Sequence, residues 1–271
     1  MTGAVADRTV AFIYLAMKIH LIRSGLIFLA AFTTPAFGQL TPSFAAHGGL
    51  QKWRSCAAVE YDLTWKGPKE KSQEHQFFDL QTRSGLITSD KYTLGSNGRE
   101  VWIKPGLNAL GGTPPRFYMW TPFYFFGMPF VFGDPGTKQE SLGRKSFHGH
   151  DYEAIRITFA KGIGDTPDDY YVAYIDPGTN QLKLAYYVVT FPAMRKGRPV
   201  EQLAPHAIVF QEWQTVDGLR VPKVAPFYKW TGTDIEGEPL GTLEFSNVHF
   251  LTQPPDAAKF DKPPDAVVAP L

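Results

Sequence analysis

The sequence predicts a mainly β protein built on an antiparallel sheet, and three observations support this prediction. From Ala57 onward, apolar residues recur with a period of two rather than 3.6. Turn-forming residues separate the apolar segments, as in SNG at 96–98 and DPGTNQ at 176–181. Helix signals are few. Roughly ten strands at this close spacing form a sheet that must curl, split into a sandwich or close on itself.

The chain begins with the pattern of a secretory signal peptide. Starting at Met17, Lys18 and Arg23 precede an apolar run at 26–32, and an A-x-G cleavage pattern ends at Gly38. The apolar run is far shorter than the roughly 20 residues of a membrane-spanning helix. We therefore expect cleavage after Gly38 and a periplasmic protein. Met17 is a possible true start, because the pattern begins there.

This division predicts a signal peptide region at 1–38 and a single β-rich domain at 39–271. Removing residues 1–38 removes three of the 27 basic and one of the 26 acidic residues, which leaves a net charge of −1. A nucleic-acid-binding protein usually carries a basic excess, so we expect no nucleic-acid partner. Cys56 is the only cysteine, which excludes a disulfide within the chain, and its apolar neighbours predict a buried thiol.

The elements follow in order along the mature chain. SFAAHGGLQKW at 43–53 predicts one or two short helical turns, with a break at Gly48 and Gly49. In VEYDLTW at 59–65, apolar and polar residues alternate, so one face of this strand meets a core and the other meets water. Similar segments predict further strands at 74–80, 99–104, 152–159, 169–176, 182–191, 207–214 and 240–250.

Two prolines stand between the last two of these segments. Pro222 and Pro226 interrupt RVPKVAPFYKW. This interruption argues against the regular strands of about ten residues that a transmembrane barrel needs. We therefore expect that the mature chain does not span a membrane.

The segment FYMWTPFYFFGMPFVF at 117–132 has nine aromatic residues and no charge. Prolines within and before it forbid a long regular element, so we expect a loop or a set of broken turns. Three interpretations are open: a wall or lid over an apolar cavity, a plug of the core, or a contact with a protein or membrane. Under the first, the ligand-binding residues are Trp120, Phe123, Tyr124, Phe125, Phe126, Met128 and Phe130. Arg116, at the edge of the segment, could meet a ligand head group, but we expect it to be solvated.

The order of several motifs adds a resemblance. AAHGGLQKW, VWIKP, GMPFVFGDPG, FHGHDYEAIRITF, DDYYVAYIDPGTNQL and VDGLRVPKV follow one another as in a family of uncharacterised exported bacterial proteins, which is similar to the outer-membrane lipoprotein carriers LolA and LolB. The resemblance covers most of residues 45–250. It implies a strongly curved antiparallel sheet, a half-open barrel wrapped over short helices. It also implies an apolar inner face, which the carriers use for the acyl chains of lipoproteins.

Imidazoles and carboxylates gather in FHGHDY and GDTPDDY. Zinc sites use such ligands, so a metal-dependent hydrolase is one alternative. It would use His148 and His150 with nearby aspartates, namely Asp151, Asp165, Asp168 and Asp169. Their spacing matches no metal motif, and both segments have the composition of turns. We therefore expect no metal, no cofactor and no catalytic residue.

Taken together, these patterns predict a periplasmic binding protein or carrier for an apolar ligand, such as a lipid or a lipoprotein acyl chain. The hydrolase is the first alternative. The second is an interaction module whose aromatic segment docks on an envelope protein.

Overall fold

The computed structural model describes residues 38–271 except 163 and 167. The expected signal peptide therefore lies outside the described residues, apart from Gly38. Two short helices open the described part, α1 (Thr41–Ala46) and α2 (Leu50–Ser55). Gly48 and Gly49 separate them with φ values of 103° and 101°, which confirms the expected break. A β-carbon on Gly48 would lie 2.1 Å from the carbonyl oxygen of Gly218, so only glycine fits there.

Within the described residues, fourteen strands form one sheet, and neighbouring strands pair antiparallel. The strands are β1 (Ala58–Lys66), β2 (Lys71–Asp79), β3 (Gly85–Thr88), β4 (Thr93–Ser96), β5 (Val101–Lys104), β6 (Thr137–Phe147), β7 (His150–Phe159), β8 (Tyr170–Ile175), β9 (Leu182–Tyr187), β10 (His206–Val209), β11 (Glu212–Val216), β12 (Leu219–Trp230), β13 (Ile235–Leu251) and β14 (Val267–Val268).

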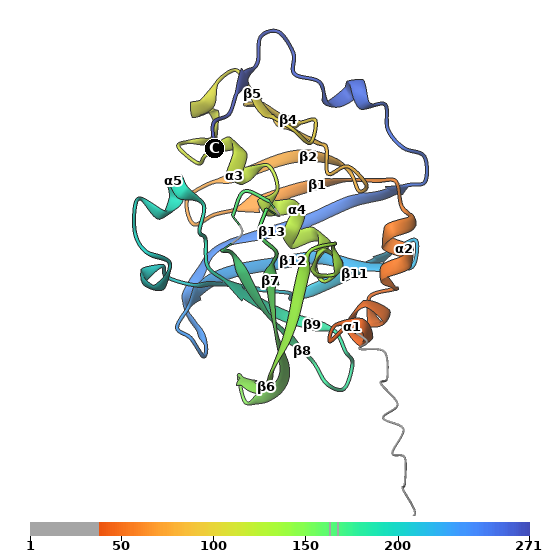
Figure 1. Cartoon of the computed structure of the whole chain (residues 1–271), viewed down its shortest axis with the longest axis vertical. Coiled ribbons are helices and arrows are strands. Elements are labelled where there is room, and N and C mark those ends of the chain that lie inside the picture. The colour runs from red at the N-terminus through yellow and green to blue at the C-terminus, as the bar shows by residue number, and fades with distance from the viewer. Residues whose placement is uncertain (1–37, 163, 167) are drawn as a thin grey trace, which may run out of the picture. The chain divides into compact units, whose positions relative to one another are not determined.

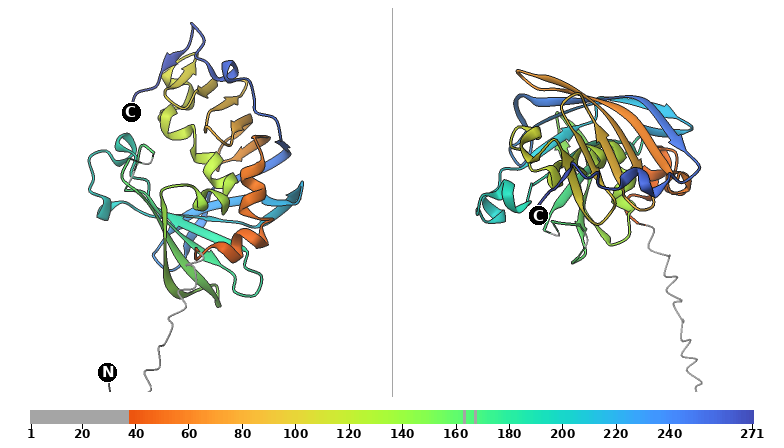
Figure 2. Two further views of the ribbon diagram at one scale, coloured as in Figure 1. Left: turned by 45° about the vertical axis from the view of Figure 1, so that its right-hand side comes forward. Right: turned by 90° about the horizontal axis from the view of Figure 1, so that it is seen from above.

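The spatial order is β14-β5-β4-β3-β2-β1-β13-β12-β10-β9-β8-β7-β6, and β11 pairs with β12 beside β10. Within the described residues the sheet has two separate edges, β14 and β6, so it is not closed. It curves strongly, and Figure 2 shows the strands arching around α4 when viewed from above. Of the three outcomes open from the sequence, the sheet therefore curls.

The strands expected from alternation are present, except that the segment 207–214 divides into β10 and β11. We did not expect β3, β4, β6, β12 or β14. In β6, side chains on both faces are largely exposed, so no apolar alternation marks it. β3 and β4 are four residues each, too short for a clear period. β12 runs through both Pro222 and Pro226, so the two prolines do not interrupt it. It pairs with β11 near Pro222 and with β10 further along, and its register shifts between Phe227 and Lys229.

The remaining helices are short. The concave side of the sheet holds α3 (Pro115–Tyr118), α4 (Thr121–Gly127) and the 3-10 turn η2 (Phe130–Gly133) between its two halves (Figure 1). Other single turns are η1 (Leu107–Leu110), α5 (Pro192–Arg195), η3 (Val200–Gln202) and η4 (Ala257–Phe260). No helix of the described residues has the length and apolar character needed to cross a membrane.

The main core lies between the concave face and these helices. Val59, Tyr61 and Leu63 on β1 point into it and are almost fully buried, whereas Asp62 stays on the outer face, as the alternation predicted. Cys56 is also buried at the edge of this core, as expected, and its burial raises the pKa of the thiol. The core is continuous from β1 across β13 and β12 to β8 and β9.

Smaller apolar clusters cover the outer face. One spans β7 to β12 and centres on Trp230, which stacks on Tyr186 at 5.2 Å between ring centroids. Another joins β2 to the C-terminal segment, where Phe260 packs against Phe77 and its carbonyl accepts a hydrogen bond from Nε1 of Trp102 at 3.0 Å. The C-terminal segment thus packs against the outer face of β1 and β2 before β14 pairs with β5.

Candidate functional site

A cavity of about 700 Å³ lies between the two halves of the curved sheet. Aromatic side chains form most of its apolar wall. They come from α2, from α3 and α4, from β7 to β9 and from the segment after β9: Trp53, Phe117, Trp120, Tyr124, Phe125, Phe159, Tyr171, Tyr187 and Phe191. The volume falls in the range of about 300–1,000 Å³ that is typical of small-molecule sites.

The aromatic segment at 117–132 forms one wall of this cavity as three short helical pieces rather than a loop. Pro115 and Pro122 each occupy the start of a helix, where their missing N–H is tolerated. The Met128–Pro129 peptide bond is cis and separates α4 from η2. Of the two expected forms, a loop or a set of broken turns, the structure shows the second, and the segment packs inside the curve of the sheet.

Side-chain hydrogen bonds hold this segment in place. Tyr118 donates its hydroxyl to Oε1 of Glu74 at 2.7 Å, and Tyr92 donates to the same oxygen. Glu74 is buried on β2, and its other oxygen accepts from Nε2 of Gln76 at 2.7 Å. In the next turn, Nε1 of Trp120 donates to the carbonyl oxygen of Arg83 at 3.2 Å. These bonds anchor α3 and α4 to β2 and to the turn that follows it.

One group of the predicted ligand-binding residues faces the core. Phe126 stacks on Tyr61 at 4.2 Å and Phe130 stacks on Trp53 at 4.8 Å, while Phe123 packs against Phe78 at 4.5 Å. Phe123, Phe126, Met128 and Phe130 are fully buried, and none of the four lines the cavity.

The other group borders the cavity. Trp120, Tyr124 and Phe125 line it, and they come from one side of the α3–α4 region. Phe125 is also packed against Tyr187 at 5.3 Å, and burial raises the pKa of Tyr124 to about 12. The segment is thus core on one side and cavity wall on the other.

Several wall residues were not predicted from the sequence. Tyr171 and Tyr187 lie opposite one another in the β8–β9 pair, and their rings are 5.6 Å apart. Phe117 packs against Phe191, with 5.7 Å between the ring centroids, and both rings line the cavity. The alternation of β8 and β9 indicates that Tyr171 and Tyr187 share the inner face, but only the curvature brings them to the aromatic segment.

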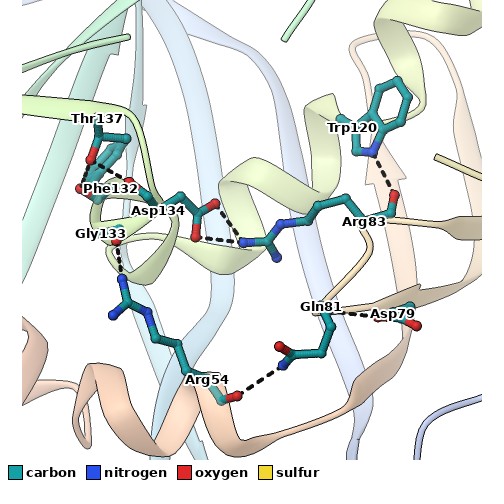
Figure 3. A network of polar contacts seen from close by, with 9 residues as sticks. All are labelled: Arg54, Asp79, Gln81, Arg83, Trp120, Phe132, Gly133, Asp134 and Thr137. Atoms are coloured by element: carbon teal, nitrogen blue, oxygen red, sulfur yellow. Dashed lines mark hydrogen bonds and ion pairs between the residues drawn. The ribbon is translucent and has the colours of Figure 1, made fainter. Parts of the chain in front are cut away.

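A polar network borders the cavity beside the β2–β3 turn (Figure 3). Nη2 of Arg83 donates to both carboxylate oxygens of Asp134, at 2.7 and 2.6 Å. Arg54 on α2 donates to the carbonyl oxygen of Gly133, and its own carbonyl accepts from Nε2 of Gln81 at 3.0 Å. The network therefore ties α2, the β2–β3 turn and η2 together.

A second ion pair lies on another side of the cavity. Arg116 on α3 donates through Nε and Nη2 to the two oxygens of Asp165, at 2.5 and 2.9 Å. The expectation of a solvated Arg116 was wrong, because the β7–β8 connection brings Asp165 to it. Nearby, Asp169 accepts from Oγ1 of Thr166 and from the backbone and hydroxyl of Thr190, while burial raises the pKa of its carboxyl.

The histidines of the alternative hydrolase lie away from the cavity, at the turn between β6 and β7. Nε2 of His148 lies 3.0 Å from Asp234, and Nε2 of His150 lies 3.0 Å from Asp176, so the two imidazoles have different carboxylate partners. Asp165 and Asp169 line the cavity instead. Among the residues that the structure describes, no three His, Cys, Asp or Glu side chains gather as metal ligands would.

Comparison with solved structures shows which known fold this architecture resembles. A LolA superfamily protein from Nitrosomonas europaea superposes with a TM-score of 0.51 at 11% identity, covering 76% of this chain and 90% of that chain. The fold is LolA-like. A DUF1329 family protein from Desulfovibrio piger matches with a TM-score of 0.46 at 11% identity, covering 79% of this chain and 94% of that chain. A putative outer membrane lipoprotein-sorting protein domain from Vibrio parahaemolyticus matches with a TM-score of 0.41 at 14% identity, covering 76% of this chain and 93% of that chain.

No family model and no curated protein matches the sequence. At 11% identity, the likeness to the LolA superfamily protein concerns the fold. It agrees with the half-open sheet over short helices that the motif order implied.

Proposed function

We propose that this protein is an exported, periplasmic carrier that binds an apolar ligand, such as a lipid or a lipoprotein acyl chain, in the cavity of its single domain at 39–271. The observation that carries this proposal is the aromatic wall of the 700 Å³ cavity on the concave side of the sheet. The LolA-like fold supports it, because a LolA superfamily protein has a similar architecture.

The chemistry of the wall suits an acyl chain. Burying a dozen methylenes contributes on the order of 10 kcal/mol before the costs of association and ordering are subtracted. Rings give a large contact area at low entropic cost, since each has only two side-chain torsions. Trp120, Tyr124 and Phe125 are the members of the aromatic segment that we assign to ligand contact, because they border the cavity.

The proposal is tested by titrating the purified exported protein with a fluorescent fatty acid. We expect micromolar binding, and Tyr124→Ala and Phe125→Ala should each weaken it about tenfold or more, because each removes on the order of 1.5–3 kcal/mol of apolar contact. Tyr228→Ala is the matched control, since this tyrosine belongs to the cluster on the outer face. It should leave binding unchanged.

Mass spectrometry of the protein taken gently from the periplasm gives an independent measurement. A carrier should retain lipid under native conditions. The proposal is wrong if the folded protein binds no apolar probe and retains none. Stoichiometric copurification of an envelope protein in that case would instead support the interaction module.

A further inference from the structure

The charged groups around the cavity are unequal in number. Four arginines line it, namely Arg54, Arg83, Arg99 and Arg116, against three aspartates, namely Asp134, Asp165 and Asp169. Two of the arginines are neutralised locally, because Arg83 binds Asp134 and Arg116 binds Asp165 through pairs of short contacts. The third aspartate is satisfied by the threonines described above.

Among the described residues of the cavity wall, this leaves Arg54 and Arg99 as the arginines that form no ion pair, although the charge of Arg54 also acts on Asp134. Arg54 uses one guanidinium nitrogen for the carbonyl oxygen of Gly133, which leaves most of its five donors available. Within the described part of the chain, the guanidinium of Arg99 makes no ion pair or side-chain hydrogen bond. Both side chains belong to exposed residues, so their donors are accessible to a ligand.

The two arginines adjoin the same structural feature, the β2–β3 turn at 80–84. Gln81 in this turn donates to the carbonyl oxygen of Arg54 at 3.0 Å. Gly98, next to Arg99, also lies against this turn, because a β-carbon added to it would be 3.4 Å from the carbonyl oxygen of Thr82. The rings of Trp120 and Tyr124 continue the wall from this turn, since the indole of Trp120 is bonded to Arg83.

From this arrangement we infer that the ligand is an anionic amphiphile. Arg54 and Arg99 bind its carboxylate or phosphate head group beside the β2–β3 turn, and its hydrocarbon chain runs along the aromatic wall. The inference rests on the proposed carrier function and adds the class of ligand. A purely apolar or cationic ligand would leave the positive charge at this end of the cavity uncompensated.

Probes of one chain length separate the head group from the chain. Dodecanoic acid, dodecyl phosphate, dodecanol and dodecyltrimethylammonium are titrated into the exported protein, with quenching of tryptophan fluorescence as the readout, because Trp53 and Trp120 line the cavity. We expect the two anions to bind about 10- to 100-fold more tightly than dodecanol, as charge-assisted hydrogen bonds would give. The tighter of the two anions then identifies carboxylate or phosphate as the preferred head group.

Arg54→Gln and Arg99→Gln should each reduce this preference about tenfold while leaving the affinity for dodecanol unchanged. If Arg54→Gln fails to fold, the effect of Arg99→Gln on the preference for anions is sufficient to test the head-group inference. Arg144→Gln is the control, because Arg144 lies on the outer strand β6 and pairs with Glu153. It should keep the full preference for anions.

Two failures are distinguishable. Equal affinities for dodecanoic acid and dodecanol, or an unchanged preference in Arg99→Gln, would overturn the head-group inference while leaving the carrier intact. If none of the four probes binds, including dodecanol, then the proposed function fails and the inference fails with it.

Discussion

At the scale of single residues, His47 shows how a polar side chain is fitted into the core. It follows α1 and is fully buried. The backbone N–H of Leu182 donates to its Nε2 at 3.2 Å, so Nδ1 carries the proton that reaches the carbonyl oxygen of Arg220 at 3.1 Å. The neutral imidazole therefore joins the N-terminal helix to β9 and β12. Burial lowers the pKa of His47 from 6.5 to about 4.

This lowered pKa predicts a pH dependence of stability. Above about pH 6.5 the imidazole is neutral in both states, and its contribution to stability is complete. As the pH falls toward 4, the unfolded chain binds the proton first, and stability is lost. Between about pH 7 and about pH 5, His47 should account for a loss of about 2 kcal/mol in the free energy of unfolding.

Urea titrations of the wild type and of His47→Gln at the two pH values measure this contribution. Between the two pH values, the free energy of unfolding of the variant should fall by about 2 kcal/mol less than that of the wild type. His249→Gln, at an exposed position of β13, is the control and should keep the wild-type sensitivity. Equal pH dependence in the wild type and His47→Gln would show that the imidazole does not titrate on unfolding in this range.

At the level of secondary-structure elements, the α3–α4–η2 segment contributes both to the core and to the cavity wall, and its amino-acid composition does not show which residue belongs to which. Its rings all have the character of core residues. The helical pieces are too short to be stable alone and owe their form to packing. Once they are helical, residues three and four apart share a side. Phe123 and Phe126 then face the sheet, while Trp120 and Tyr124 face the cavity.

Adjacent phenylalanines in α4 should respond differently to truncation. Phe126→Ala removes a ring packed against both Tyr61 and Phe245, and the enclosed void should cost about 3–5 kcal/mol in the free energy of unfolding. Phe125→Ala enlarges an existing cavity instead, so its cost should be less than about half of that. Urea denaturation measures both.

Similar losses in both variants would show that Phe125 is core in the same sense as Phe126. The wall assigned to the ligand would then be reduced to Trp120 and Tyr124. Circular dichroism of each variant checks that its fold is retained.

At the level of the whole domain, the core is covered by one open, curved sheet rather than enclosed between the two sheets of a sandwich. Its two halves meet through β13 and β12, and the helices between them fill part of the concave side. Residues from α2, α3, α4 and the four strands β6 to β9 surround the remaining space. Ligand capacity is therefore a property of the curvature and not of any one element.

Export is the prediction that concerns the whole chain. The A-x-G pattern before Gln39 predicts that the protein recovered from the periplasm begins at Gln39. N-terminal sequencing measures this, and Ala36→Arg should block processing, because signal peptidase sites need small residues at this position. A mature chain that still begins at Met1 or Met17 would contradict the periplasmic assignment.

The β class, the helix break at Gly48 and Gly49 and the inner face of strands such as β1 could all be predicted from the sequence. These features depend on local conformation and on a period of two, both of which can be read from neighbouring residues. The motif order further implied the half-open sheet that the fold comparison shows.

Which aromatic residues face the cavity could not be predicted from the sequence, because this depends on three-dimensional packing. The aromatic segment has no clean period, so the sequence could not divide Phe125 from Phe126, and the proline-broken pieces became helical only against the sheet. The ion pairs also could not be predicted, because their partners are far apart in the sequence. Arg116 and Asp165 are 49 residues apart, and Arg83 and Asp134 are 51 residues apart. Such contacts form because the curvature of the sheet brings distant segments together, and this curvature cannot be predicted from a local sequence pattern.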